Sequence, residues 1–269
     1  MATSIFDTLG VATLEHHWTT LLSSAFVCGI IVQLSQVLCP ILFPATYPKL
    51  QGSKKLNWDV HVVSTVHAIV IVTLAAPLLW NENLTQNKIF GYEYYAGQVY
   101  AVCCGYFLWD TIHSIRHVKD FGIGFVLHGI CSFSVFIFSF RPFLQYFGGS
   151  CLMFELSTPF LNIHWFMDKT GLTGSIYQKV NGIILLTVFF CARIVFGFYT
   201  GYLALISVLP VIDLVPMHLR IVYASANIAL NSLNVYWFYK MVASLGRRFS
   251  GPPKSVATKG DATKAKRDQ

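Results

Sequence analysis

Residues 106–165 read YFLWDTIHSIRHVKDFGIGFVLHGICSFSVFIFSFRPFLQYFGGSCLMFELSTPFLNIHW and are the most informative part of the chain. Most of this stretch is apolar enough to lie in a lipid bilayer. It nevertheless carries five polar side chains at the expected membrane depth: Asp110, His113, His128, Glu155 and Asn162. Ionisable groups inside a membrane are costly and usually face a bundle interior or a water-filled cavity. We therefore expect these side chains to surround a common space.

The composition is that of a polytopic membrane protein. Of 269 residues, 55% are hydrophobic and only 12% are charged, whereas soluble domains carry roughly 25% charged residues. Residues 1–17 include Asp7 and Glu15 and lack a basic region, so we expect no cleaved signal peptide. The seven cysteines lie within or at the ends of apolar segments and form no Cys-x-x-Cys pattern. This favours buried thiols over a disulfide framework or a metal site.

A membrane-spanning helix needs roughly 20 predominantly apolar residues. The sequence predicts an all-α protein with seven such segments, within a range of six to eight. They are residues 18–38, which end before Pro40, then 61–80, 94–114, 121–140, 143–163, 180–209 and 219–245. Arg141-Pro142 separates the fourth segment from the fifth. These two segments could instead form a re-entrant hairpin.

The distribution of basic residues predicts the orientation in the membrane. With seven spans, 15 of the 19 Lys and Arg residues fall on one side, which is typical of the cytosolic side. Residues 1–17 would then be lumenal, 18–55 the first span and a cytosolic loop, and 56–245 the main membrane domain. The tail, 246–269, is rich in Gly, Pro, Ala and Lys, which predicts a disordered cytosolic segment. Its charge favours anionic lipid headgroups over nucleic acid as a partner.

The third and fourth segments carry the first candidate site residues. Asp110 and His113 are three residues apart and share a helix face, which His117 extends. They form either an interfacial pair or part of a site, and one His-x-x-x-His spacing does not indicate a metal centre. His128 lies in the middle of its segment. It is either a hydrogen-bonded core residue or a neutral imidazole that acts as nucleophile or general base.

The later segments carry further polar residues. Glu155 and Asn162 are seven residues apart, which predicts one helix face, and Pro159 between them is expected to kink the helix and free a carbonyl. Arg193 is the expected counter-charge of Glu155 or Asp110. Asn227, Asn231 and Asn234 follow one face of the last helix, where hydrogen bonds between helices account for them.

Several short motifs between residues 56 and 240 resemble the TLC domain. This is the membrane domain of ceramide synthases and of smaller TLC-domain-containing proteins of the endoplasmic reticulum, and the likeness is greatest to subgroup four of the latter. The motifs are Asn57-Trp58, the run from Val62 to His67, Gly105 to Asp110, Lys119-Asp120-Phe121, His128, Glu155 to Asn162, Trp165, Asn181-Gly182 and Arg193.

This resemblance implies a helical bundle around a lipid-sized cavity. In ceramide synthases, two adjacent histidines and two aspartates serve acyl transfer from acyl-CoA to a sphingoid amine. Here His128 matches the first histidine and Gly129 replaces the second, while Glu155 and Thr158 stand at the two aspartate positions. The motif of the acyltransferases is therefore half present.

We expect a multi-pass protein of the endoplasmic reticulum membrane that acts in lipid homeostasis by binding or modifying an acyl-chain lipid. The terminal Lys266-Arg267-Asp268-Gln269 resembles a cytosolic retrieval signal. An alternative is an acyltransferase that uses His128 with acyl-CoA as co-substrate, and a lower one is a seven-span receptor or transporter. No resident cofactor, metal or nucleic acid is expected. The catalytic candidates are His128, Asp110, His113 and Glu155, and the lipid-binding candidates are Arg193, Asn162 and His67.

Overall fold

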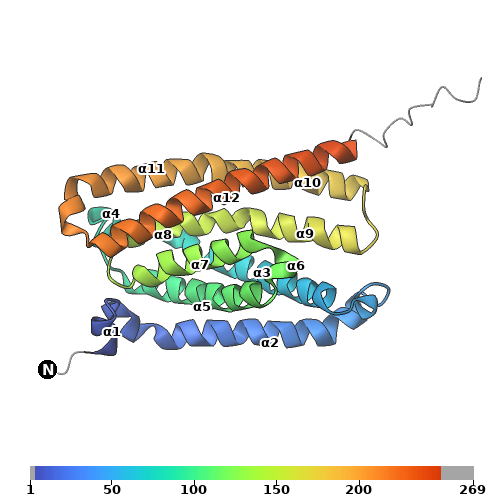
Figure 1. The fold of residues 1–269 in the computed structure, drawn as a ribbon, viewed down its shortest axis with the longest axis horizontal. Helices are drawn as coiled ribbons and strands as arrows, with labels where there is room; N and C mark the ends of the chain where they lie inside the picture. The colour runs from blue at the N-terminus through green and yellow to red at the C-terminus, as the bar shows by residue number, and fades with distance from the viewer. Residues whose placement is uncertain (1–3, 250–269) are drawn as a thin grey trace, which may run out of the picture.

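Long helices run along a common axis in the computed structural model, which describes residues 4–249 (Figure 1). Their bounds are α2 (Trp18–Leu42), α3 (Ser53–Ala75), α5 (Tyr94–Arg116), α7 (Ile123–Phe138), α9 (Thr158–Lys169), α10 (Ile176–Phe189), α11 (Phe196–Val208) and α12 (Met217–Phe249). The shorter helices α1 (Ile5–Thr8), α4 (Glu82–Gln86), α6 (Val118–Phe121) and α8 (Gln145–Leu152) lie between them. The described residues contain no strand, so the predicted all-α class is confirmed.

Tighter and wider turns join several of these helices. Turns of 3₁₀ helix cover Ala12–His16, Tyr47–Lys49, Ala76–Trp80, Met153–Ser157 and Leu209–Leu214, and a π-helical segment, Phe190–Val195, joins α10 to α11. Helical turns therefore connect α3 to Trp80, α8 to α9, and α10 to α11, whereas the turn Leu209–Leu214 is kinked at Val211, which has non-helical φ and ψ. Residues 246–249 of the predicted disordered tail belong to α12, and the remainder of that tail lies outside the described residues.

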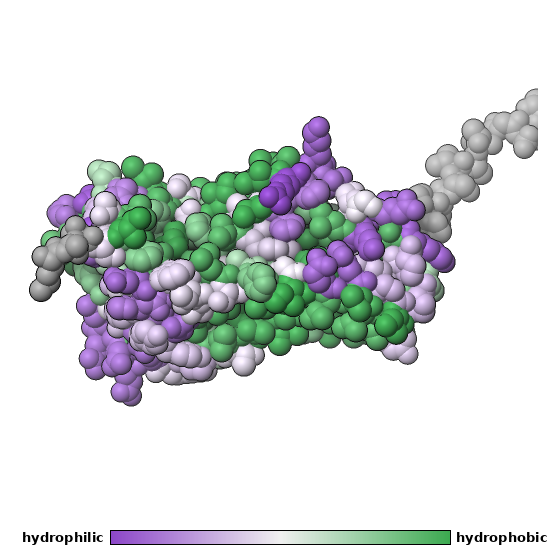
Figure 2. All heavy atoms as spheres, turned by 90° about the horizontal axis from the view of Figure 1, so that it is seen from below, coloured by the Kyte–Doolittle hydropathy of each residue, from purple (hydrophilic) through white to green (hydrophobic). Residues whose placement is uncertain are grey.

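Three helical stretches are long and apolar enough to cross a membrane: Trp18–Leu42, Ser53–Trp80 and Ile176–Leu214. Helix α7 is apolar but shorter. Figure 2 shows the face on the side of α2, where hydrophobic residues run along most of the length and hydrophilic residues gather towards the two ends. We call these ends the Trp18 end and the Ser53 end, after the first residues of α2 and α3. The surface and the helix lengths together are those of a multi-pass membrane protein.

Two glycines allow α5 to pack tightly between α2 and α7. A Cβ atom at Gly105 would lie 2.3 Å from the carbonyl oxygen of Leu21 on α2. A Cβ atom at Gly129 on α7 would lie 2.5 Å from the hydroxyl of Thr111 on α5. Small residues let membrane helices approach closely, and dispersion contacts between the backbones then stabilise the bundle. This packing fixes α5 and α7, the helices that carry Asp110 and His128.

The structure corrects three sequence-based expectations. The first helix does not end before Pro40 but continues to Leu42, because a proline in the last turn loses only one hydrogen bond near the helix end. Residues 143–163 are not one helix: Leu144 adopts φ 58°, and the 3₁₀ turn Met153–Ser157 separates α8 from α9. Pro159 does not kink a helix, since it stands in the first turn of α9, where its missing N–H needs no partner.

Candidate functional site

A cavity of about 520 Å³ occupies the half of the bundle towards the Ser53 end. Its wall is largely apolar and includes Phe107, Leu185 and Trp237, while Lys240 and Asp168 lie near its opening. Of the predicted site residues, it is lined by Asp110, His128, Glu155, Asn162 and Arg193. Ligand pockets usually combine an apolar wall with a few polar groups, and their volumes are commonly about 300–1,000 Å³. These five side chains line one cavity, and its volume lies within the range of ligand pockets.

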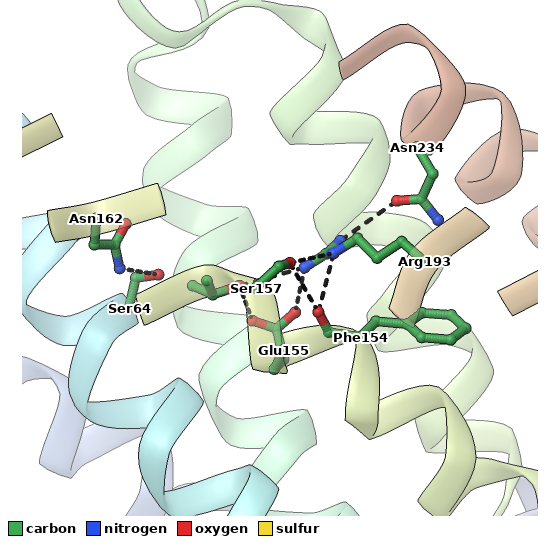
Figure 3. Close-up of polar contacts among 8 residues, drawn as sticks. Ser64, Phe154, Glu155, Ser157, Asn162, Arg193 and Asn234 are labelled. Atoms are coloured by element: carbon green, nitrogen blue, oxygen red, sulfur yellow. Dashed lines mark hydrogen bonds and ion pairs between the residues drawn. The ribbon is translucent and has the colours of Figure 1, made fainter. Parts of the chain in front are cut away.

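The inner end of this cavity is formed by an ion pair (Figure 3). Arg193 Nη2 lies 3.1 Å from Glu155 Oε1, and the Thr158 hydroxyl donates to Glu155 Oε2 at 2.6 Å. Glu155 is only 8% exposed and Arg193 only 7% exposed. Both carboxylate oxygens thus accept hydrogen bonds from the protein itself. Of the two acids considered for Arg193, Glu155 is the partner.

The remaining donors of Arg193 fix its guanidinium group. Nε donates to the Phe154 carbonyl at 3.0 Å and to the Ser157 hydroxyl at 3.1 Å, and Nη1 donates to Asn234 Oδ1 at 3.4 Å (Figure 3). Arg193 lies in the π-helical segment, a conformation that occurs frequently at functional sites. These contacts join the turn before α9 to α12 through one side chain. The pair is consequently rigid and carries no net charge.

Asn162 ties α9 to α3 at the wall of the same cavity. Its side-chain nitrogen donates to Thr65 Oγ1 at 2.9 Å, to Ser64 Oγ at 3.2 Å and to the His61 carbonyl at 3.3 Å. One amide nitrogen has two hydrogens, so these three acceptors share them. The predicted lipid-binding role of Asn162 would have to use its oxygen, because its nitrogen is occupied by α3.

His128 and Asp110 line the cavity without the hydrogen bonds that hold Glu155. The His128 ring is half-buried between aromatic rings, with centroids 5.7 Å from Phe107 and 5.5 Å from Trp237. Within the described residues, neither His128 nor Asp110 makes a side-chain hydrogen bond or an ion pair. Of the four predicted catalytic residues, these two therefore line the cavity with side chains that are available to a ligand.

Two predicted site residues do not line the cavity. His113 Nδ1 bonds the Trp109 carbonyl at 2.9 Å, so Asp110 does not orient it as the sequence spacing suggested. His67 is 7% exposed and stacks on Tyr106 with ring centroids 3.7 Å apart. His113 shares α5 with Asp110, and His67 contacts the cavity residue Tyr106, but neither histidine lines the cavity itself. Their assignments as catalytic and lipid-binding residues stay predictions without geometric support.

The sequence reasoning missed some residues of the site and explained others differently. Thr158, noted only as a replacement for an aspartate, is the second hydrogen-bond partner of Glu155. Asn234, interpreted as a helix-to-helix contact, holds Arg193. Ser157 received no role, although its hydroxyl accepts from the same guanidinium. The Glu-x-x-Thr spacing was the available signal for Thr158, because residues three apart lie on one helix face.

Gly129 explains why a second histidine is absent next to His128. A Cβ atom there would lie 2.5 Å from the Thr111 hydroxyl and 3.3 Å from the Thr111 Cα atom, so any larger residue requires Thr111 to move. A histidine there would also disturb the α5–α7 contact beside His128.

Among the described residues, no group of three His, Cys, Asp or Glu side chains is arranged to hold a metal ion.

Comparisons with known proteins agree with this architecture. The TLC-domain family profile matches residues 57–243. An uncharacterized TLC domain-containing protein of Schizosaccharomyces pombe is 42% identical, over 97% of this chain and 90% of its own length. Topoisomerase I damage affected protein 4 of Saccharomyces cerevisiae is 36% identical over 70% and 69% of the two chains, and TLC domain-containing protein 4 of Homo sapiens is 28% identical over 72% and 76%. No solved structure matches.

Proposed function

Because this chain belongs to the TLC-domain family of membrane proteins linked to lipid metabolism, we propose that it binds an acyl-chain lipid in the 520 Å³ cavity. The resemblance to the small subgroup-four proteins is confirmed by relatives of that name in human, frog and fish. We further propose that the protein resides in the endoplasmic reticulum and acts there in lipid homeostasis. The family assignment rests on the comparisons, and the binding role rests on the cavity.

The distribution of polar groups in the cavity supports an amphipathic ligand. Apolar side chains such as Phe107, Leu185 and Phe189 would contact an acyl chain, whereas Lys240 and Asp168 near the opening would contact a polar headgroup. Burying apolar surface stabilises such a complex by about 25 cal/mol per Å². Lys54 and Lys55 in the first turn of α3 and Lys169 in the last turn of α9 lie at the Ser53 end, and we propose that a lipid enters the cavity from the leaflet on that side (Figure 1).

Filling the cavity should remove a bound lipid. Leu186 lines the cavity on α10, whereas Ile183 on the same helix is 54% exposed on its outer side. We expect Leu186→Trp to lower the amount of lipid that native mass spectrometry detects on the purified protein, and Ile183→Trp to leave it unchanged. Equal lipid retention in the two folded variants, or a wild-type protein that carries no lipid, would contradict lipid binding in this cavity.

Acyl transfer by His128 is a second candidate function, which one observation favours. His128 and Asp110 line the same cavity, and neither is held by another protein group. In this version the neutral His128 imidazole is the nucleophile or base, and Asp110 rather than Glu155 is the carboxylate that can orient it. Glu155 is excluded from that task because Arg193 and Thr158 occupy both of its oxygens.

Separate measurements distinguish chemistry from binding. If His128 takes part in acyl transfer, purified protein incubated with acyl-CoA should form an acyl product or an acyl adduct, and His128→Gln should abolish it while lipid retention persists. If the wild-type protein retains lipid but forms no acyl product or adduct, the acyl-transfer function is contradicted and lipid binding remains.

We also propose that all seven predicted segments cross the bilayer, with a lumenal N-terminus and a cytosolic C-terminus. The basic residues at the Ser53 end support this orientation, because cytosolic loops collect Lys and Arg. In sealed microsomes, protease should therefore remove a tag at the C-terminus and spare a tag at the N-terminus. Permeabilised microsomes serve as the control in which both tags are cleaved. Protection of the C-terminal tag would contradict the seven-span topology.

A further inference from the structure

A second cavity lies on the Trp18 side of the Glu155–Arg193 pair. Its volume is about 140 Å³, and α7, α8, α11 and α12 surround it. It shares His128, Glu155 and Arg193 with the larger cavity. Along α12 it is lined from Tyr223 to Asn234, and the larger cavity continues from Trp237 to Leu245. The two cavities therefore adjoin each other at the Glu155–Arg193 pair and extend from it in opposite directions along α12.

Two buried hydroxyl groups face the small cavity without a partner. Ser132 on α7 is 5% exposed and Thr200 on α11 is 4% exposed, and both line the cavity. Neither side chain makes a hydrogen bond within the described residues. Serine and threonine in membrane helices commonly bond a carbonyl of the preceding turn, as Ser134 does with the Ile130 carbonyl at 2.8 Å. The two hydroxyls therefore keep their hydrogen-bonding capacity for a polar atom of a ligand in the cavity.

The charges around the small cavity select the class of ligand. Its only charged lining groups, Glu155 and Arg193, neutralise each other, and both carboxylate oxygens are already occupied. A phosphate, a carboxylate or an ammonium group would lack a counter-charge there, and burying an unpaired charge is costly. A neutral hydroxyl can both donate to and accept from Ser132 and Thr200. The lining thus matches an alcohol better than an ionic headgroup.

The position of Asn227 indicates how such a ligand enters. Asn227 lines the small cavity on α12 and is exposed on the flank of the bundle, and Asn231 donates to its oxygen at 3.1 Å. Polar side chains at this depth are costly when they face hydrocarbon. Because Asn227 both lines the cavity and is exposed, we infer that the cavity opens beside it on the flank of the bundle. A molecule dissolved in the bilayer can reach the cavity there without passing the larger one.

We propose that the small cavity binds the hydroxyl end of a neutral long-chain lipid alcohol that enters from the bilayer beside Asn227. A volume of 140 Å³ is close to that of an engineered apolar cavity of about 150 Å³ that binds benzene. It therefore holds the hydroxyl and the first few carbons, and the rest of the chain extends through the opening. This site is independent of the lipid proposed for the 520 Å³ cavity.

Photolabelling tests the proposal on the full chain in lipid nanodiscs. The probe is hexadecanol with a photoactivatable diazirine near the hydroxyl, and its methyl ether is the comparison compound. We expect the alcohol to label peptides of α7, α11 or α12 that line the small cavity, and the ether to label them less. Loss of one hydrogen bond weakens binding by roughly two- to tenfold.

Matched variants separate the hydroxyl contacts from general damage to the fold. Thr200→Val and Ser132→Ala should each lower labelling by the alcohol by roughly two- to tenfold. Thr73→Val and Ser134→Ala remove exposed hydroxyls that bond their own helices, and they should leave labelling unchanged. Unlabelled hexadecanol and a diacylglycerol serve as competitors, and displacement by one or both identifies which alcohol the site accepts.

The opposite results would overturn the proposal. The first is equal labelling by the alcohol and its methyl ether. The second is wild-type labelling of the folded Thr200→Val and Ser132→Ala variants. The third is labelling that neither competitor reduces. Lipid retention by the larger cavity is measured separately through Leu186→Trp, so failure of one site does not decide the other.

Discussion

Arg193→Met should leave little folded protein, because it leaves the Glu155 carboxylate buried in the bundle without its ion-pair partner. The guanidinium makes five hydrogen bonds in the structure, to Phe154, Ser157, Asn234, Glu155 and Thr158. Removing one partner of a buried ion pair commonly costs about 3–5 kcal/mol, since the other charge stays buried and unpaired. We expect a large loss of monodisperse protein in detergent and a lower melting temperature for whatever remains.

A double substitution tests whether the charge itself causes this loss. Glu155→Gln combined with Arg193→Met removes both charges and keeps similar volumes, so it should recover much of the stability that Arg193→Met loses. Arg116→Met, at an exposed position at the end of α5, is the control and should have little effect. A folded, thermally stable Arg193→Met single variant would show that the ion pair does not hold α9, α10 and α12 together.

Gly105→Leu should separate α2 from α5 and destabilise the bundle strongly. The first atom of any side chain there meets backbone: the Leu21 oxygen at 2.3 Å and the Ala25 nitrogen at 2.8 Å. Backbone atoms of a helix cannot rotate away, and overpacking of this kind costs about 1–3 kcal/mol or more. The shift would also lengthen the hydrogen bond from Ser24 to the Val102 carbonyl, which is 2.7 Å. The measurement is the thermal unfolding of the purified protein.

Gly29→Leu is the matched control on the opposing helix. A Cβ atom at Gly29 has no neighbour within 4 Å, and glycine in a helix interior is less favourable than other residues by up to about 1 kcal/mol. Gly29→Leu should therefore leave the melting temperature unchanged or raise it slightly. If both variants unfold at the same temperature, the close α2–α5 contact is not required for stability.

The sequence alone was sufficient to predict an all-α membrane protein and to select five residues that line one cavity. Long apolar runs predict membrane or core helices, and six of the seven predicted segments overlap a long helix, whereas residues 143–163 form α8, a 3₁₀ turn and part of α9. Polar residues inside such runs are few, so Asp110, His128, Glu155, Asn162 and Arg193 could be selected from the sequence, and all five line one cavity. The distribution of Lys and Arg predicts the orientation in the membrane, because this prediction depends only on the composition of the loops.

The tertiary structure decided which of these residues meet. Helical periodicity gives the relative directions of side chains on one helix, but it does not give the rotation of that helix against its neighbours. His113 and His67 therefore lie outside the cavity, and Arg193 pairs with Glu155 rather than Asp110. Glu155 and Asn162 both line the cavity, but their hydrogen-bond partners could not be read from their spacing. A 3₁₀ turn between α8 and α9 changes the rotation per residue, so Glu155 bonds Arg193 on one side while the nitrogen of Asn162 bonds α3 on another. The small cavity arises from the packing of four helices around Ser132 and Thr200, and no local sequence pattern specifies such a space.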